Sequence, residues 1–545
     1  MENNNKNTKS KKEIENEFFK KHGPDVHLDP VRFITIARLC QGKVLDIGCG
    51  TGHLADFWKG DYVGLDISDV AITYAQTLRR KTATFICEDV TQPWKDDDVK
   101  CDTIVMAEFL EHLTDDEQVF KNIRQVIKPD GRIIISVPNG GRIPDPDHFR
   151  EFTVPELRKR FSSFGRVKFH NWPGFVGRIL MTIDLGQKNE NLLALVMIVR
   201  NEGKGLERAV LSCIDYVDKI VLSVDCWNED NTLDIAKRYA DVIKRHTWAN
   251  DFSKARNFAQ EGVDSKWILS LDGHEYVDTC PDLRERLKEE TDAFRIRMRM
   301  ENNSIFYTSR LYRSFLKWKK PIHNMIETEK SKVYKKFVIR HDRLEGQSKK
   351  AALIRAKQRE KMMPKLLKEE LRKKGGNVRA YFYLARWYFT QIKLKKAVKY
   401  FKKYIKTSKN AGQKWSCCYE AAICANGMKK PLLALKFLEK AEELIPNRWE
   451  IAKHRGLTYM LFEQWKKAIP LLTDSFKVNT GEFSFTPEIQ DKADIWDKLG
   501  YCYFQLKEHK KAKVCWEEAI KNEANSDKRK LNKKRIELID RDLIK

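Results

Sequence analysis

The feature that most constrains the fold of this chain is a fourfold repeat in its last third. Alignment on Ala397, Ala434, Ala468 and Ala512 places Ala385, Ala422, Gly456 and Gly500 twelve residues earlier in every copy. The positions nine before and four after each alanine are also matched: Tyr388, Ala425, Tyr459 and Tyr503, and Phe401, Leu438, Leu472 and Trp516. The copies lie 37, 34 and 44 residues apart in a helical pattern. Residues 346–545 are therefore predicted to be an all-α array of helix pairs.

Small residues where paired helices cross, flanked by aromatic residues, resemble the tetratricopeptide repeat. Pro446 closes one copy where that pattern favours proline. The resemblance covers about Gly376 to Asn525. It implies a helical solenoid and gives almost no information about the chemistry that the protein performs.

The repeat region is also strongly basic. Residues 346–545 hold 47 Lys and Arg against 23 Asp and Glu, a net charge of +24 out of +26 for the chain. Such a field attracts nucleic acid, anionic glycan, acidic protein or lipid headgroups alike. We expect aromatics such as Tyr381 on the concave face and lysines such as Lys399 on the convex face. This arrangement favours steering of an anionic acceptor or a protein partner over sequence-specific nucleic-acid binding, and a merely solvated lysine-rich surface is the alternative.

Length and composition limit the class of protein. A chain of 545 residues predicts three or four domains, and 42% hydrophobic with 33% charged residues excludes disordered and fibrous classes. The longest apolar run, Leu192 to Val199, is too short to span a bilayer. Residues 1–26 are predicted to be a polar, disordered tail without a signal peptide, and a cytoplasmic location is expected. Twelve scattered cysteines indicate reduced thiols rather than disulfides or a zinc site.

Two α/β domains are predicted before the repeats. Residues 27–186 alternate short apolar strands with helical stretches, as a parallel sheet with crossover helices does. At residues 187–191 the chain becomes polar, and a second α/β series fills residues 187–345. The fold class is therefore multidomain: a Rossmann-like α/β domain, a second α/β domain and an all-α solenoid.

The first chemical motif is VLDIGCGTGHLA, residues 44–55. A strand that leads into a glycine-rich turn and a helix lets the backbone approach a ligand closely and aims amide donors at it. A dinucleotide-binding loop would carry its third glycine at position 53, where this chain has His53, and Gly52 stands one residue earlier. The carboxylate of Asp46 suits a cationic ligand better than a pyrophosphate.

This motif resembles motif I of class I S-adenosylmethionine-dependent methyltransferases. The resemblance extends over about Val26 to Gly174 and implies that Asp46, Gly48, Gly50, Gly52, Asp66 and Asp89 bind the methyl donor. Asp66 corresponds to the acceptor of the ribose hydroxyls, and Asp89 to the residue beside the adenine amino group. His112, in MAEFLEHL, corresponds to a histidine near the methyl acceptor, and a capping or core histidine is the alternative.

The second α/β domain carries four motifs in order: MIVRNEG, IVLSVDCWNEDNTLD, WANDFSKARNFA and WILSLDGHEYVD. A strand that ends in paired ligands suits a metal bridging a diphosphate. The motifs resemble family-two glycosyltransferases of the GT-A fold, in the branch with C-terminal tetratricopeptide repeats. The resemblance implies a nucleotide-sugar donor, with a UDP-sugar as the expected class, bound by Asn201, Glu202, Asp225, Arg256 and Asp272.

Three departures from that family pattern stand out. Its metal motif usually reads Leu-Asp-Ala-Asp-Glu, whereas residues 271–275 read LDGHE, so histidine replaces the second aspartate. Imidazole is a good ligand for manganese-like ions, and we expect Asp272, His274 and His341 to bind Mn²⁺ or Mg²⁺. A lost metal site is the alternative. Trp227 and Asn228 alter the nucleotide loop.

The family's histidine-acid pair is incomplete in the segment of residues 310–327. His323 is followed by Asn324, so the acid is missing. Glu327 takes its place only if the segment is helical. His323 and Glu327 are the expected catalytic pair, and a surface histidine is the alternative.

The sequence therefore predicts a bifunctional transferase acting in glycan or glycoconjugate modification. It joins an S-adenosylmethionine-dependent methyltransferase to a nucleotide-sugar glycosyltransferase and a basic repeat scaffold. The alternative is a repeat-scaffold binding protein whose glycosyltransferase-like domain is catalytically inactive. The altered residues 272–275 keep that alternative open.

Overall fold

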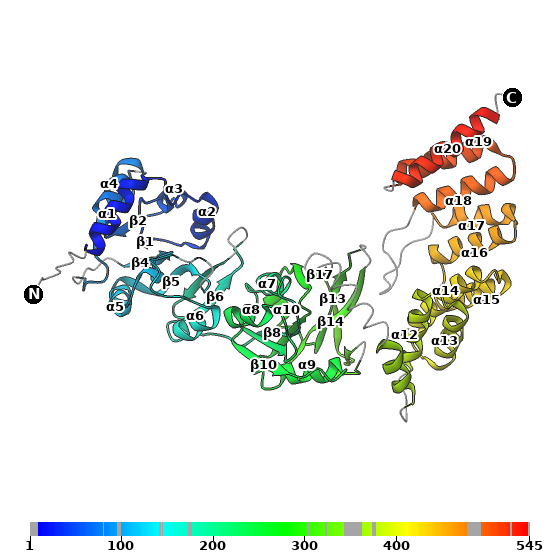
Figure 1. Cartoon of the computed structure of the whole chain (residues 1–545), viewed down its shortest axis with the longest axis horizontal. Coiled ribbons are helices and arrows are strands. Elements are labelled where there is room, and N and C mark those ends of the chain that lie inside the picture. The colour runs from blue at the N-terminus through cyan, green and yellow to red at the C-terminus, as the bar shows by residue number, and fades with distance from the viewer. Residues whose placement is uncertain are drawn as a thin grey trace, which may run out of the picture. The chain divides into compact units, whose positions relative to one another are not determined.

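The structure is a computed structural model of the whole chain (Figure 1). It describes residues 9–79, 81–94, 100–140, 143, 145–172, 177–301, 305–321, 324–342, 362–372, 378–476, 492–523 and 526–542. The catalytic candidate His323 and the predicted domain boundary at residues 345/346 lie outside the described residues. Contacts divide the chain into two units, Met1–Ile296 with Thr308–Gly346, and Arg297–Tyr307 with Gln347–Lys545.

The first α/β domain is built on a seven-stranded sheet of order β3-β2-β1-β4-β5-β7-β6. The strands are β1 Val44–Ile47, β2 Tyr62–Asp66, β3 Thr84–Cys87, β4 Cys101–Ala107, β5 Ile127–Pro138, β6 Arg166–His170 and β7 Arg178–Asp184. Strands β1 to β5 are parallel, and β7 is antiparallel to both of its neighbours. Because parallel strands end at one edge, the residues that follow β1, β2, β3 and β4 gather there.

The helices of this domain are α1 Lys11–His22, α2 Pro30–Leu39, α3 Leu54–Phe57, α4 Asp69–Leu78, α5 Glu117–Val126 and α6 Val154–Phe161. The prediction of a disordered tail over residues 1–26 is wrong for α1. Ser10 and Glu13 form a capping box at its start, each side chain accepting the other's backbone N–H. Phe19, only 3% exposed, anchors the helix to the domain.

The second α/β domain is built on an eight-stranded sheet of order β10-β9-β8-β11-β14-β13-β17-β12. Its strands are β8 Leu193–Val199, β9 Lys219–Asp225, β10 Val242–His246, β11 Trp267–Leu271, β12 Glu275–Thr279, β13 Ala293–Arg299, β14 Ile305–Arg313 and β17 Ser331–His341. Its helices are α7 Leu206–Leu211, α8 Thr232–Tyr239, α9 Phe252–Gln260 and α10 Leu283–Arg286. A short hairpin joins β15 Trp318–Lys319 to β16 Met325–Ile326. The parallel strands β8, β9 and β11 carry the predicted motifs at their carboxyl ends.

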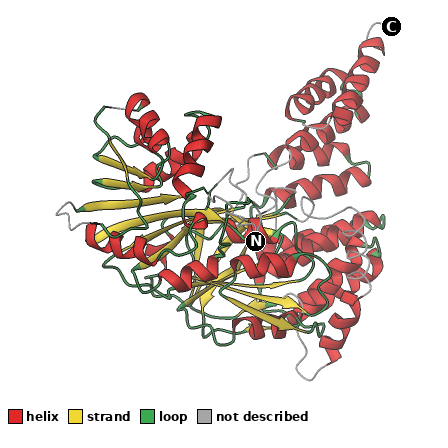
Figure 2. Ribbon diagram, turned by 60° about the vertical axis from the view of Figure 1, so that its left-hand side comes forward, coloured by secondary structure: helices red, strands yellow, loops and turns green. Residues whose placement is uncertain are grey.

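The described part of the repeat region is helical (Figure 2). Its antiparallel pairs are α12 Arg379–Thr390 with α13 Leu394–Thr407, α14 Ala411–Gly427 with α15 Pro431–Leu444, α16 Trp449–Leu461 with α17 Trp465–Asp474, and α18 Lys492–Gln505 with α19 His509–Asn522, followed by α20 Ser526–Asp542. The four aligned alanines are fully buried. Five residues before each alanine, the turn holds a residue of positive φ: Ile392, Lys429, Glu463 and Lys507. The turns confirm the register read from the sequence.

None of the helices among the described residues is both long and apolar enough to cross a membrane. All twelve cysteines are free thiols, as their scattered spacing predicts.

Candidate functional site

The glycine-rich turn after β1 lies at the carboxyl edge of the first sheet. The N–H groups of Gly48 and Cys49 both donate to the carbonyl oxygen of Leu65 at the end of β2, which fixes the turn against the neighbouring strand. Gly48 has φ +72°, and a Cβ built on it would lie 2.5 Å from Cδ2 of Phe109. A side chain at position 48 is therefore excluded by both backbone and space.

Asp66 at the end of β2 completes this turn. Its Oδ2 accepts a hydrogen bond from the N–H of Gly50 at 2.8 Å, and its Oδ1 accepts one from the N–H of Ser68 at 2.9 Å. A carboxylate has about four lone-pair positions, so these two bonds leave capacity for further donors. Burial raises the pKa of Asp66, although its backbone hydrogen bonds oppose the shift.

Asp46 and Asp89 take different positions around the turn. Asp46 is buried in β1 and accepts a hydrogen bond from the Tyr62 hydroxyl at 2.6 Å, and burial raises its pKa to about 7. Asp89 follows β3 and accepts from both the N–H and the hydroxyl of Thr91. Asp46 therefore binds β1 to Tyr62 of β2, and Asp89 fixes the loop after β3.

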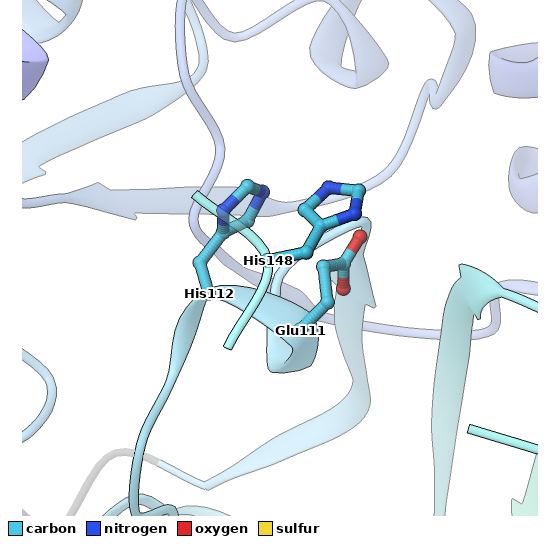
Figure 3. Close-up of side chains that lie close together, drawn as sticks. All are labelled: Glu111, His112 and His148. Carbon is cyan, nitrogen blue, oxygen red and sulfur yellow. The ribbon is translucent and has the colours of Figure 1, made fainter. Parts of the chain in front are cut away.

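His112 lies in a cluster that includes two residues not predicted as site residues. Glu111 and His112 belong to the short 3-10 helix η1 Leu110–His112, and His148 comes from the loop before α6 (Figure 3). One nitrogen or oxygen atom of each side chain lies within 4.8 Å of the others. Burial lowers the pKa of His112, and burial followed by the nearby Glu108 raises the pKa of Glu111 to about 8. We call Glu111, His112 and His148 the first cluster.

Asp272 in the second domain is held by two arginines. Arg256 Nη2 donates to its Oδ1 at 2.5 Å, and Arg310 Nη2 donates to its Oδ2 at 3.1 Å. Arg310 Nη2 also donates to Oε1 of the buried Glu275 at 2.7 Å. Burial alone would raise the pKa of Asp272, but the two guanidinium groups hold it well below its usual range. Arg256 is thus directed at Asp272 and at the Ser270 hydroxyl.

His274, Glu275 and His341 form a second cluster, whose ligand atoms also lie within 4.8 Å of one another. The two imidazole Nε2 atoms are 3.1 Å apart, because β12 and β17 pair Glu275 with His341. This second cluster contains His274 and His341, as predicted, with Glu275 in the place expected for Asp272.

Asn201, Glu202 and Asp225 surround the carboxyl ends of β8 and β9. Asn201 has φ +52°, and its side chain accepts a hydrogen bond from the N–H of Glu229. Glu202 Oε1 lies 3.7 Å from Nδ1 of His274. Asp225 is buried and accepts from the N–H of Trp227 at 2.8 Å. Of these three residues, Glu202 adjoins the second cluster.

The helical placement on which the prediction for Glu327 depends is absent. Residues 325–326 form strand β16, and Glu327 follows it. Its carboxylate makes ion pairs with Lys319 at 3.1 Å and Lys320 at 3.2 Å. Burial would raise the pKa of Glu327, but the two lysines lower it overall.

Four further residues were not predicted as site residues: Glu111, His148, Glu275 and Arg310. Glu111 and Glu275 stand beside predicted histidines, so the Glu-His and His-Glu pairs were a usable local signal. His148 and Arg310 lie 36 residues from His112 and His274, and no local pattern marks them.

Comparisons with known proteins agree with this geometry. A model of the methyltransferase domain family matches residues 45–135, and a model of glycosyl transferase family 2 matches residues 194–345. The chain therefore contains a methyltransferase domain and a family 2 glycosyltransferase domain, followed by helical repeats of the tetratricopeptide type. The families and the fold class predicted from the sequence are confirmed.

Three curated relatives match parts of the chain. A TPR repeat-containing protein of Synechococcus elongatus is 32% identical over 143 residues, which is 25% of this chain and 35% of that protein. A ubiquinone biosynthesis O-methyltransferase of Aliivibrio fischeri is 28% identical over 137 residues, 23% of this chain and 57% of that protein. The SPbeta prophage-derived glycosyltransferase SunS of Bacillus subtilis is 40% identical over 78 residues, 14% of this chain and 18% of that protein.

Two solved structures match part of the chain. MamA is 15% identical, with 32% of this chain and 95% of that chain covered and a TM-score of 0.27. YrrB, described as a TPR protein with an unusual peptide-binding site, is 18% identical, with 34% and 86% covered and a TM-score of 0.26.

Proposed function

We propose that the chain is a bifunctional transferase that modifies a glycan or glycoconjugate. Its first domain uses S-adenosylmethionine and its second uses a nucleotide-sugar, with a UDP-sugar as the expected class. The observation that carries the proposal is the turn of Gly48 and Gly50, which a hydrogen bond to Asp66 fixes at the carboxyl edge of the first sheet. The matches to both transferase families support it.

In the first domain, S-adenosylmethionine supplies an electrophilic methyl group when bound. The turn at Gly48 lets the backbone approach the donor, and the remaining lone pairs of Asp66 accept from ribose hydroxyls. Asp89 holds the loop after β3 at the same edge. Catalysis then depends mainly on proximity and orientation of donor and acceptor.

The test is calorimetric binding of S-adenosylmethionine to the full chain. Asp66→Asn should weaken binding by about 1–3 kcal/mol, because the charged acceptor is lost. Asp69→Asn, at the exposed start of α4, is the matched control and should leave binding unchanged. Binding of a nicotinamide dinucleotide in place of the methyl donor would overturn the proposal.

For the second domain we propose that a divalent cation, Mn²⁺ or Mg²⁺, neutralises the leaving diphosphate of the donor. The second cluster fits Mn²⁺ better than Mg²⁺, since two imidazoles and a carboxylate suit manganese-like cations. Asp225, Asn201 and Glu202 lie in the loops that would contact the nucleotide. Asp272, held by Arg256 and Arg310, keeps these arginines in place and contacts the donor.

Cation-dependent binding of UDP tests this assignment. His274→Ala should abolish the dependence on Mn²⁺, whereas Asp272→Asn should weaken UDP binding and preserve the dependence. His170→Ala, in strand β6 of the other domain, is the control. If Asp272→Asn abolishes the Mn²⁺ dependence and His274→Ala does not, Asp272 holds the cation and His274 does not, which contradicts both the second cluster and the ligand set predicted from the sequence.

A second candidate function is favoured by one observation. Arg310 compensates Glu275 and Asp272 without any cation. The second domain would then be an inactive scaffold, and the basic repeats would bind a protein partner. A chain that binds S-adenosylmethionine but neither UDP nor Mn²⁺ at the second cluster would support this candidate.

The basic repeats are proposed to steer an anionic acceptor or to bind a protein partner. Binding of a polyanion such as heparin to the full chain should weaken steeply between low and physiological salt. Replacement of Lys399, Lys402 and Lys403 by glutamine should reduce that binding. Unchanged binding would favour a merely solvated surface.

A further inference from the structure

We infer that Glu111, His112 and His148 form a binding site for a divalent transition-metal cation in the methyltransferase domain. We infer further that the cation takes a hydroxyl group of the methyl acceptor as an additional ligand. The binding of an acceptor hydroxyl to the cation rests on the proposed methyltransferase function. The metal site itself rests on the geometry of the first cluster alone.

The three side chains converge from two segments of the chain. Figure 3 shows the two imidazole rings above η1, with the Glu111 carboxylate beside the His148 ring. The ring centroids of His112 and His148 are 5.0 Å apart, and one ligand atom from each residue lies within 4.8 Å of the others. Two ligands bound at about 2.1 Å from one ion at the tetrahedral angle are about 3.4 Å apart. A side-chain adjustment of up to about 1.4 Å therefore closes the site.

The backbone orients both imidazoles. Nδ1 of His112 lies 3.1 Å from the carbonyl oxygen of Asp147, and Nδ1 of His148 lies 3.1 Å from that of Ile143. A carbonyl oxygen only accepts, so Nδ1 of His112 donates and its Nε2 keeps the lone pair that a metal requires. A ring nitrogen that donates to a backbone carbonyl is the usual outer-shell support of a metal-bound histidine.

Glu111 supplies an independent observation. Its side chain is fully buried, and among the described residues neither carboxylate oxygen has a hydrogen-bond partner. Its neighbour Glu108 is satisfied by Arg178 at 2.8 Å and by the Ser136 hydroxyl at 2.9 Å. A buried carboxylate without donors is costly unless a counter-charge compensates it. A cation between Glu111 and the two imidazoles provides that charge.

The site is placed for methyl transfer. Phe109, two residues before Glu111, is the side chain that a Cβ at Gly48 would meet, so the cluster's segment packs directly on the donor turn. Three protein ligands leave coordination positions open. An acceptor hydroxyl bound there loses its proton to water more easily, because the cation lowers its pKa.

Atoms and electrons are conserved in the resulting methyl transfer. The oxygen lone pair forms the O–CH₃ bond as the S–CH₃ bond breaks. The bonding pair returns to sulfur, which changes from a sulfonium to a neutral thioether, and the hydroxyl proton has passed to water. Two imidazoles with one carboxylate favour Mn²⁺, Fe²⁺, Co²⁺ or Zn²⁺ over Ca²⁺ or Mg²⁺.

The experiment measures Mn²⁺ binding to the chelator-treated full chain by electron paramagnetic resonance. His274→Ala serves as the background, because it removes the second cluster. One equivalent of Mn²⁺ should bind, with nuclear coupling from imidazole nitrogen. Glu111→Gln and His148→Ala should each weaken this binding at least 10-fold, whereas the matched controls Glu117→Gln and His170→Ala should change it less than twofold.

Absence of bound Mn²⁺ in the background chain, bound Mn²⁺ without nitrogen coupling, or unchanged affinity in both variants would overturn the inference. S-adenosylmethionine binding is measured on the same preparations. A chain that binds the methyl donor but no Mn²⁺ contradicts the metal site alone. A chain that binds Mn²⁺ but no methyl donor contradicts the proposed function and leaves the metal site standing.

Discussion

The first and second clusters contain the same residue types, two histidines and one buried glutamate, in two different domains. They differ in how the glutamate is compensated. Glu275 accepts from Arg310 and from the N–H of Asp272, whereas the carboxylate oxygens of Glu111 have no hydrogen-bond partner among the described residues. Arg310 balances the charge of Glu275 in the second cluster, whereas the cation inferred at the first cluster would balance an ionised Glu111.

This difference teaches that composition alone does not define a metal site. Arg310 holds Glu275 of the second cluster and the adjacent Asp272. A cation there adds function more than stability. A cation at the first cluster adds both, because it removes the cost of a buried unpartnered carboxylate.

The largest effect is expected when Arg310, which compensates the acids of the second domain, is replaced. Arg310→Leu leaves the buried Glu275 and the partly buried Asp272 with one guanidinium fewer, and should destabilise the second domain by about 3–5 kcal/mol. Differential scanning calorimetry of the full chain measures the loss as a lowered transition of that domain. Arg295→Leu, on the exposed side of β13, is the control and should change stability by less than about 0.5 kcal/mol. Equal effects of the two variants would contradict the compensation by Arg310.

A second prediction extends the contrast to two aspartates, the buried Asp46 and the partly buried Asp272. Asp46 accepts one hydrogen bond from Tyr62, and burial raises its pKa to about 7, whereas the arginines around Asp272 hold its pKa low. Because the folded state then binds a proton that the unfolded state releases, stability is full below about pH 4 and falls as the pH rises through about 7. The loss from this group should total about 2–4 kcal/mol.

Comparison with Asp46→Asn isolates this dependence from that of other groups. Calorimetry of the donor-free chain between pH 5 and 8 should show a fall in stability of the first domain that is smaller in the variant. Asp56→Asn, on the short helix α3, is the control and should retain the slope of the unaltered chain. Parallel slopes for the unaltered chain and Asp46→Asn would show that Asp46 does not titrate in this range.

The sequence predicts features that depend on local spacing. The glycine turn, the strand ends at Asp66 and Asp272 and the repeat register at Ala397 are all read from neighbouring residues, and their elements lie where expected. The capping box of Ser10 and Glu13 is equally local. The polar composition around it nevertheless led to the wrong prediction of a disordered tail.

Features that depend on chain folding could not be read in this way. Glu111 meets His148 only because η1 and the loop before α6 lie at one edge of the sheet. Arg310 reaches Glu275 because β14 pairs with β11 beside the metal motif. Burial decides which of these acids needs a partner, and burial is a property of the folded chain.

The smallest expected effect concerns an exposed ion pair. It tests whether burial, rather than the pairing of a glutamate with basic groups, sets the loss of folding stability when one partner is removed. Glu327 is 36% exposed and pairs with two lysines on the β15–β16 hairpin. Solvent screens such a pair, so Glu327→Gln should lower the stability measured by calorimetry by at most about 1 kcal/mol. The loss expected for Arg310→Leu is about 3–5 kcal/mol. UDP binding should also be unchanged, because this carboxylate pairs with Lys319 and Lys320. A loss of more than about 2 kcal/mol would mean that exposed and buried pairs in this domain do not differ in the way the two clusters indicate.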